Sequence, residues 1–280
     1  MGAARTVTAM AMDFRLEAEG DVAPESLDAV MGHVATDLQW ADEVFSPYRE
    51  HSWISRLSRG ECRVADAPPA VAEVLDLCER FREETAGAFD ARTPAGAIDP
   101  TGIVKTWAME RVRWRLGLLG ATGWLWGCAG DVVVDGRGPA EGGWRVGIAD
   151  PRTAAQAAAQ ATAQPAALAP GMPPGPRAAH RPPSAVVSTA VLNAGASALA
   201  TSGDAHRPGH IWDPRTGAPA THFAQVSVRG GDLVTCDAWA TAIVAGGKKT
   251  LRLGLEAGLE VLALRVLDGK VHAQASAGFA

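Results

Sequence analysis

The stretch from 123 to 136, GWLWGCAGDVVVDG, decides the fold class. It holds two short strand-like runs, GWLWGCAG (123–130) and DVVVDG (131–136), and a third run, WRVGIAD, follows at 144–150. Along the chain, such runs mix with helical patterns without the regular alternation of a βαβ protein. This mixture is typical of an α+β fold with largely antiparallel sheets flanked by helices, and that is the fold class we predict.

Apolar spacing predicts the other elements of the fold. We expect one strand over 5–17, helices over 24–45 and about 68–86, and a third helix from about Ile103 to Leu118 that stops at Gly120. Near the C-terminus the pattern predicts a strand in FAQVSVRGG (223–231), a helix in CDAWATAIVAGG (236–247), and a final helix and hairpin that turns at Asp268-Gly269.

Composition limits the classes of function. The 280 residues are 47% hydrophobic, enough to bury a full core, and we expect one large domain of two packed halves over 1–280. The formal charge of -5 provides no basic field for a nucleic-acid backbone, so nucleic acid is not an expected partner. A low-complexity stretch rich in Ala, then Pro and Gly, occupies 153–183, where we expect a mobile surface insertion.

Targeting signals and cysteines point to the cytoplasm. No run of eighteen or more apolar residues is present, so we expect no transmembrane segment, and the N-terminus alternates at strand period instead of forming a signal-peptide core. The four cysteines lie far apart without a CxxC pair, which favours free thiols over a zinc knuckle or disulfides. A cytoplasmic protein is the expectation.

The polar stretch TSGDAHRPGHIWDPRTG (201–217) allows several interpretations. His206 and His210 have the spacing of two zinc ligands on one helix, but the Pro and Gly between them exclude that helix. Ser202 has no GxSxG elbow around it, so a hydrolase triad is discounted. The segment DPRTG is either a plain turn or a loop whose Arg215 approaches a ligand.

A carboxylate and a hydroxyl lie one helical turn apart in CDAWATA. If Thr235 caps the helix, Asp237 falls in its first turn and Thr241 lies on the same face. Such a pair can hold Mg²⁺, which prefers oxygen ligands. Ordinary capping explains the aspartate as well, and the residues by themselves favour capping.

The segment IDPTGIVKTWAMERV predicts an anion site. Asp99 precedes a helix whose amides around 102–104 should be free to meet a phosphate, and Lys105 lies close behind. The spacing is not that of a P-loop, and the chain contains no GxGxxG. A nucleotide bound here would therefore be held in another way.

Seven segments in order resemble the ApbE family of FAD:protein FMN transferases. They are FSPYREHSWISRL (45–57), GAFDARTPAG (87–96), IDPTGIVKTWAMERV (98–112), GCAGDVVVDG (127–136), ATSGD (200–204), HIWDPRTG (210–217) and CDAWATA (236–242). The resemblance spans about Met10 to Gly247, nearly the whole chain. It implies an enzyme that moves FMN from FAD to a Thr or Ser hydroxyl of an acceptor protein, with AMP as the leaving group and Mg²⁺ as cofactor.

The resemblance also implies site residues. The positions that match the family's FAD contacts are Met10, Tyr48, Ala88, Phe89, Asp90, Asp99, Lys105 and Ile211. The positions that match its magnesium ligands are Asp237, Thr241 and the backbone carbonyl of Gly102, so the resemblance reverses the preference for simple capping. No residue is assigned as the general base; His210 and the acidic residues are candidates only.

Departures from the family pattern leave alternatives open. This chain has DPTG and KTWA where the family usually has DLGG and KGYA, and GCAGD replaces paired glycines before Asp131. Thr106 in place of glycine could narrow the approach to the phosphates. The alternatives to the transferase are an FAD pyrophosphatase that yields FMN and AMP, and a flavin-binding protein without turnover.

Overall fold

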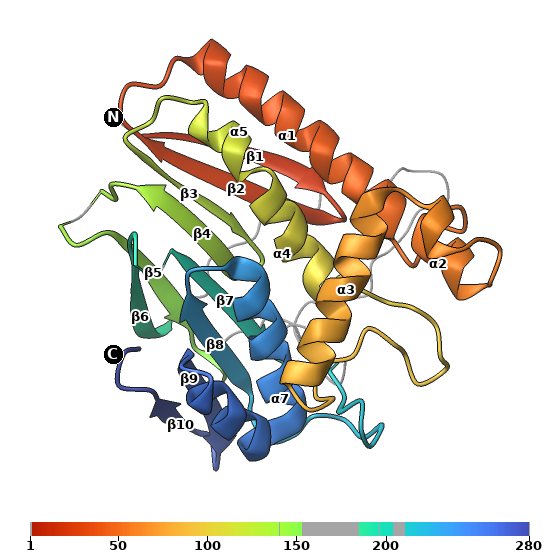
Figure 1. Cartoon of the computed structure of the whole chain (residues 1–280). Coiled ribbons are helices and arrows are strands. Elements are labelled where there is room, and N and C mark those ends of the chain that lie inside the picture. Colours follow the sequence, from red (N-terminus) through yellow and green to blue (C-terminus); the bar gives the residue numbers. More distant parts are fainter. Residues whose placement is uncertain (1, 140, 153–184, 196, 204–210, 280) are drawn as a thin grey trace, which may run out of the picture.

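An eight-stranded antiparallel sheet forms the centre of the protein (Figure 1). The structure is a computed structural model, and it describes residues 2–139, 141–152, 185–195, 197–203 and 211–279. The sheet order is β1-β2-β3-β4-β7-β8-β9-β10, and every neighbouring pair is antiparallel. The strands are β1 Ala3–Ala9, β2 Met12–Glu19, β3 Gly123–Cys128, β4 Asp131–Gly136, β7 Ala198–Gly203, β8 Gln225–Gly230, β9 Glu260–Leu267 and β10 Lys270–Ala275.

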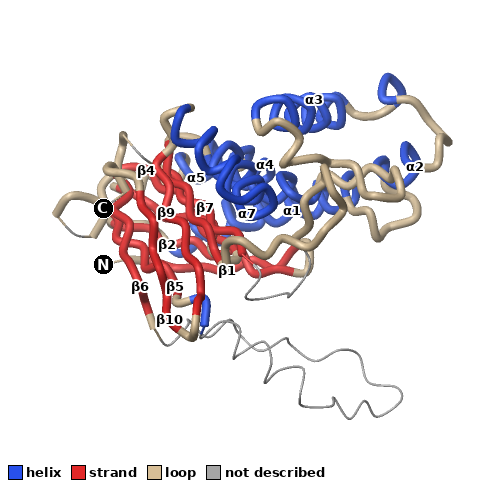
Figure 2. Tube along the Cα trace, turned by 90° about the horizontal axis from the view of Figure 1, so that it is seen from below, coloured by secondary structure: helices blue, strands red, loops and turns tan. Residues whose placement is uncertain are grey.

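A separate antiparallel pair, β5 (Trp144–Ala149) and β6 (Val186–Leu192), completes the strands. The helices are α1 Pro24–Phe45, α2 Trp53–Ser58, α3 Pro69–Glu84, α4 Thr101–Arg111, α5 Arg113–Gly117 and α7 Leu233–Glu256, with a short 3₁₀ turn at Val64–Asp66. Figure 2 shows the helices on one face of the main sheet. There α7 packs on β7 and β8, α1 packs on β1, and α4 contacts both α1 and α7. The predicted α+β class with antiparallel sheets is confirmed.

The two faces of the main sheet bury two apolar clusters, because successive side chains of a strand point to opposite faces. On β4, Val133 joins the large cluster under the helices, whereas Val134 joins a smaller cluster with Trp144 of β5 and Leu192 of β6. The β5–β6 pair therefore contributes to the face opposite the helices. This arrangement explains why the middle strands are apolar on both sides.

The expected strand over 5–17 is wrong in one respect, because the chain turns back in its middle. Met10 and Ala11 have φ values of 50° and 57°, and they join β1 to β2 as a two-residue hairpin turn. Turns of this kind normally use Gly, Asn or Asp, since positive φ is costly for other residues. Met10-Ala11 contains none of these residues, so the alternating pattern predicted a single strand.

Helix boundaries differ from expectation in two further places. The predicted helix over 103–118 is two helices, α4 and α5, with Val112 as the C-cap of the first and the N-cap of the second. The N-cap of α7 is Asp232, whose carboxylate accepts from the Thr235 N–H at 2.7 Å. Thr235 is therefore not the cap, and Asp237 lies in the second turn of the helix.

Other expectations hold. Helix α1 matches the predicted 24–45, and β9 and β10 form the hairpin at Asp268-Gly269. Cys62, Cys78, Cys128 and Cys236 are free thiols. The expected insertion at 153–183 lies outside the described residues, and so do His206 and His210. Within the part of the chain that the structure describes, no helix combines the length and apolar character needed to cross a bilayer.

Candidate active site

Charged side chains from two helices and one strand meet between α4, β4 and α7. Lys105 lies on α4, Asp131 is the first residue of β4, and Asp237 lies on α7. The Lys105 ammonium forms an ion pair with the Asp131 carboxylate, and its Nζ lies 3.9 Å from Oδ2 of Asp237. Asp131 is fully buried and Asp237 is 5% exposed. We call these three residues the charged cluster.

The charged cluster holds two carboxylates against one ammonium. Burial raises the pKa of Asp237 to about 7; the Lys105 ammonium and a hydrogen bond from Thr106 oppose that rise, and the Asp131 carboxylate adds to it. Burial would lower the pKa of Lys105, but attraction to Asp131 and Asp237 outweighs burial and raises it, so the ammonium stays charged. With both aspartates ionised, the cluster carries one uncompensated negative charge, and a bound cation would balance it.

Hydroxyl and amide groups surround the charged cluster. The Thr106 hydroxyl lies 3.0 Å from Oδ2 of Asp237, and the Thr201 N–H donates to Oδ1 of Asp131 at 2.9 Å. The hydroxyl oxygens of Ser202 and Thr241 lie 2.8 Å apart. Thr201 and Ser202 on β7 thus contact the aspartate of the GCAGD stretch and the predicted ligand Thr241, respectively.

The first turn of α4 lies against the GAFD segment. A Cβ placed on Gly102 would lie 3.1 Å from the ring atom Cε2 of Phe89, so glycine permits this close approach. Phe89 is buried, and its N–H donates to the Thr85 hydroxyl at 3.0 Å. The structure therefore brings the predicted residues Gly102 and Phe89 together.

The expectation of free amides at 102–104 is wrong for two of the three residues. The N–H groups of Ile103 and Val104 both donate to the Pro100 carbonyl, at 3.0 and 3.1 Å. The N-cap of α4 is Pro100, and the Asp99 Oδ1 accepts from the Thr101 N–H at 3.1 Å. The carbonyl of Pro100 thus occupies donors that the sequence pattern assigned to an anion.

The DPRTG segment forms the expected turn, and Arg215 packs beside two other motif segments. Asp213 accepts both guanidinium contacts of Arg215, at 2.8 and 2.7 Å, and this pairing lowers the pKa of Asp213. A Cβ on Gly87 would lie 3.4 Å from Cγ of Arg215, and a Cβ on Gly246 would lie 2.9 Å from its Nη2 and from the Ala88 Cβ. The turn, the GAFD segment and Gly246 of α7 therefore meet at Arg215.

The remaining predicted residues lie outside these contacts. Oδ1 of Asp90 accepts from the Arg92 N–H at 2.8 Å, and Ile211 is buried with its carbonyl bonded to the Ala220 N–H at 2.9 Å. Met10 lines a hollow of about 380 Å³ together with Arg49. Tyr48, next to Arg49 in sequence, is 89% exposed. Among the described residues, no hydrogen bond or ion pair joins Met10, Tyr48 or Ile211 to the charged cluster.

The predicted metal ligands have the chemistry that Mg²⁺ prefers. The set consists of one carboxylate, one hydroxyl and one backbone carbonyl, all of them oxygen donors, beside a cluster with excess negative charge. Over the described ranges, no group of three or more His, Cys, Asp or Glu side chains has metal-binding geometry. A set with a single carboxylate is compatible with that result, so the residues present fit a magnesium ion.

Two residues that sequence reasoning did not assign stand out in this site. Asp131 holds Lys105, and the stretch GCAGD before β4 is the signal that could have identified it. Thr106 bonds to Asp237, although the sequence pattern marked it only as a departure from glycine. Both depend on contacts between α4, β4 and α7 that no local pattern shows.

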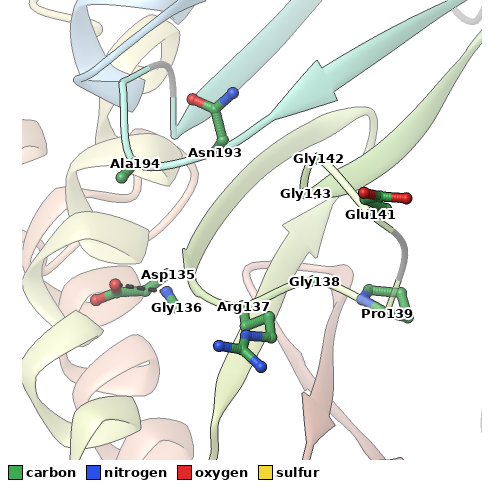
Figure 3. Close-up of a pocket in the computed structure, with 10 residues that line it drawn as sticks. All are labelled: Asp135, Gly136, Arg137, Gly138, Pro139, Glu141, Gly142, Gly143, Asn193 and Ala194. Atoms are coloured by element: carbon green, nitrogen blue, oxygen red, sulfur yellow. Dashed lines mark hydrogen bonds between the residues drawn. The ribbon is translucent and has the colours of Figure 1, made fainter.

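A larger hollow of about 750 Å³ lies elsewhere, where β4 leads toward β5. Glycine-rich backbone lines much of it, and the hollow is drawn in Figure 3. Asp135, Arg137 and Glu141 project in different directions there, with no convergent polar group. The charged cluster remains the better candidate site.

The fold and the site define a class of α+β protein in which two carboxylates and one ammonium lie between two helices and an antiparallel sheet. Comparison of the sequence with family models gives a match to the ApbE family over residues 91–263, more than half of the chain. The chain therefore belongs to the ApbE family. A search for similar curated proteins found no match.

Solved structures resemble the whole chain. The flavinyl transferase ApbE of Pseudomonas stutzeri in its apo form matches with a TM-score of 0.75 at 20% identity. The match covers 100% of this chain and 96% of that one. The flavin transferase ApbE of Vibrio cholerae gives 0.72 at 17% identity, and an ApbE protein of Thermotoga maritima gives 0.72 at 21% identity; each match covers 100% of this chain and 98% of the other. At these identities the likeness establishes the fold.

Proposed function

We propose that this protein is a magnesium-dependent FAD:protein FMN transferase. A Thr or Ser hydroxyl of an acceptor protein attacks the FMN-side phosphorus of FAD, a phosphoester bond forms to the acceptor, and the pyrophosphate bond breaks to release AMP. Membership in the ApbE family supports the reaction class, and the named activity of the similar solved structures agrees with it.

The observation that carries the proposal is the charged cluster of Lys105, Asp131 and Asp237 between α4, β4 and α7. Phosphoryl transfer needs mainly alignment and charge stabilisation around the pyrophosphate. An ammonium held in place by two carboxylates is a fixed positive charge that needs no rearrangement during the reaction. Lys105 can therefore stabilise negative charge on the pyrophosphate while Asp131 keeps its ammonium in position.

Asp237, Thr241 and the Gly102 carbonyl would hold Mg²⁺. A magnesium ion at this place would neutralise charge that develops on the leaving phosphate oxygen. The residues themselves orient the ligands: the Ser202 hydroxyl fixes the Thr241 hydroxyl at 2.8 Å, and Thr106 fixes the Asp237 carboxylate at 3.0 Å.

The flavin itself is proposed to lie along the other matched residues. Ala88, Phe89, Asp90 and Asp99 come from the segments that border the first turn of α4, and Phe89 lies against Gly102. Met10 would contribute from the hollow at the β1–β2 turn, Tyr48 through its exposed ring, and Ile211 from the HIWDPRTG segment. Tyr48 offers an aromatic face on which a flavin ring could stack.

The test is to incubate the protein with FAD, Mg²⁺ and a Thr-containing acceptor fragment, and to follow AMP release and acceptor mass together. The proposal predicts equal amounts of AMP and of acceptor that has gained the mass of FMN. AMP with free FMN would instead identify a pyrophosphatase. Bound FAD with neither product would leave a flavin-binding protein and contradict the proposal.

A further inference from the structure

Thr106 lies between two oxygen acceptors in the interior. Its side chain is fully buried on α4, and its Oγ1 lies 3.0 Å from the Ile103 carbonyl and 3.0 Å from Oδ2 of Asp237. A threonine hydroxyl has one proton to donate. An ionised carboxylate is the stronger acceptor, so the proton favours Asp237 when that residue is charged.

The donors to Asp237 converge on one of its oxygens. Lys105 approaches Oδ2 at 3.9 Å, and the Thr106 hydroxyl approaches the same atom. Among the described residues, no hydrogen bond or ion pair involves Oδ1. Two donors from adjacent positions of α4 therefore fix one oxygen of the carboxylate and leave the other to bind something else.

We propose that Thr106 is a positioning residue, which holds the Asp237 carboxylate by Oδ2 so that Oδ1 is presented to a divalent cation. The inference rests on the proposed function, since it assumes that Asp237 is a metal ligand. Threonine suits this task because its β-branched side chain has few rotamers in a helix, and burial restricts it further. Hydrogen bonds of this kind orient metal ligands and tune their affinity.

A purely structural role makes a different prediction. If Thr106 only satisfies its own hydroxyl through the Ile103 carbonyl, replacing it with valine changes stability and leaves metal affinity as it was. If Thr106 positions Asp237, valine weakens metal binding and serine, which keeps the hydroxyl, restores it. Metal affinity therefore separates the two roles without reference to turnover.

The experiment titrates Mn²⁺, as the probe, into wild type, Thr106→Val and Thr106→Ser, and measures free Mn²⁺ by electron paramagnetic resonance. Each titration is done with Mn²⁺ alone and with saturating FAD. Thr250→Val is the matched control, because Thr250 is also fully buried and its hydroxyl has no hydrogen-bond partner among the described residues. Thermal unfolding checks that each variant folds, and Thr106→Ala replaces the valine variant if that one does not.

We expect Thr106→Val to bind Mn²⁺ about tenfold more weakly, with Thr106→Ser and Thr250→Val close to wild type. Equal affinity in Thr106→Val and wild type would overturn the positioning role and leave the proposed function intact. A wild-type protein that binds no Mn²⁺ under either condition would overturn the metal site itself, and the positioning role with it.

Discussion

The two faces of the main sheet are packed against different kinds of side chain. On the helix side lie the buried carboxylates of Asp131 and Asp237 and the partly buried ammonium of Lys105. On the opposite side, the cluster around Trp144 and Leu192 consists of apolar side chains. The ionised groups beside the β5–β6 pair are matched one to one, Asp150 with Arg152 and Arg229 with Glu260, whereas the charged cluster has two carboxylates for one ammonium.

This difference separates function from stability. Burying ions costs free energy that apolar side chains of the same volume avoid, so a buried ion cluster is poor evidence for a stabilising role. The apolar cluster under β5 and β6 avoids this desolvation cost and stabilises the fold by burial of apolar surface. The charged cluster is best explained by what it binds, and variants on the two faces should therefore fail in different ways.

The largest effect is expected for Asp237→Ala. Loss of the proposed metal ligand should lower AMP release by about a thousandfold, while the protein still folds because one of two competing buried carboxylates is gone. A coupled assay for AMP together with thermal unfolding measures both. Asp135→Ala, at the exposed end of β4, is the matched control and should keep wild-type turnover. Unchanged turnover in Asp237→Ala would remove the basis of the comparison.

Lys105→Met should lower stability as well as turnover. It leaves Asp131 and Asp237 as neighbouring buried carboxylates without a counter-charge, which should cost about 3 kcal/mol of unfolding free energy at neutral pH. The loss of unfolding free energy should be smaller at acidic pH, where the carboxyls are protonated. Urea denaturation at two pH values measures it. Adding Asp131→Asn should recover part of the loss; if the double variant is no better than Lys105→Met, the ion pair is not the cause.

Leu192→Ala on the opposite face should lower stability and leave turnover unchanged. The leucine is fully buried, and its truncation should cost about 2–3 kcal/mol through lost burial and a cavity. The folded fraction should retain wild-type FAD affinity and turnover at a temperature well below unfolding. A fall in turnover matching that of Asp237→Ala would show that the two faces are not separable.

Gly246→Ala is expected to have a moderate effect. Its new Cβ would lie 2.0 Å from the Thr250 hydroxyl and 2.9 Å from both Ala88 and Arg215, so α7 and the GAFD segment must shift. Overpacking of this kind should cost about 1–2 kcal/mol of stability and weaken FAD binding. Flavin fluorescence titration and urea denaturation measure the two effects.

The control for this variant is Gly32→Ala on α1, where an added Cβ meets nothing within 4 Å. Alanine is the better helix former, so Gly32→Ala should stabilise by about 0.5–1 kcal/mol and leave FAD affinity unchanged. Equal losses in both glycine variants would argue that the contact with Ala88 and Arg215 has no special importance.

Much of the fold followed from local patterns, and the exceptions have physical causes. The period of apolar residues predicted α1 and the mixture of helices with antiparallel strands. The β1–β2 turn was not predicted because Met10-Ala11 adopts positive φ without glycine or asparagine. The packing of α1 on β1 accompanies that turn and is not visible in the local sequence.

The site was less accessible to sequence reasoning. The spacing of Asp237 and Thr241 suggested oxygen ligands, but capping explained it equally well until the order of seven segments indicated the ApbE family. The partners of Lys105 could not be predicted, since the end of α4, the helix α5 and the strand β3 separate it from Asp131 in sequence. The role of Thr106 depends on a contact with α7 across 131 positions of sequence.

The most direct test of the account is the dependence of acceptor mass on a divalent cation. The protein is freed of metal with a chelator and mixed with FAD and a Thr-containing acceptor fragment, before and after Mg²⁺ is restored. We predict no mass gain without metal, a gain equal to FMN on adding Mg²⁺, and no gain for Asp237→Ala in either case. FMN transfer that continues without any divalent cation, or that survives in Asp237→Ala, would contradict the assignment of Asp237 as a ligand of the metal.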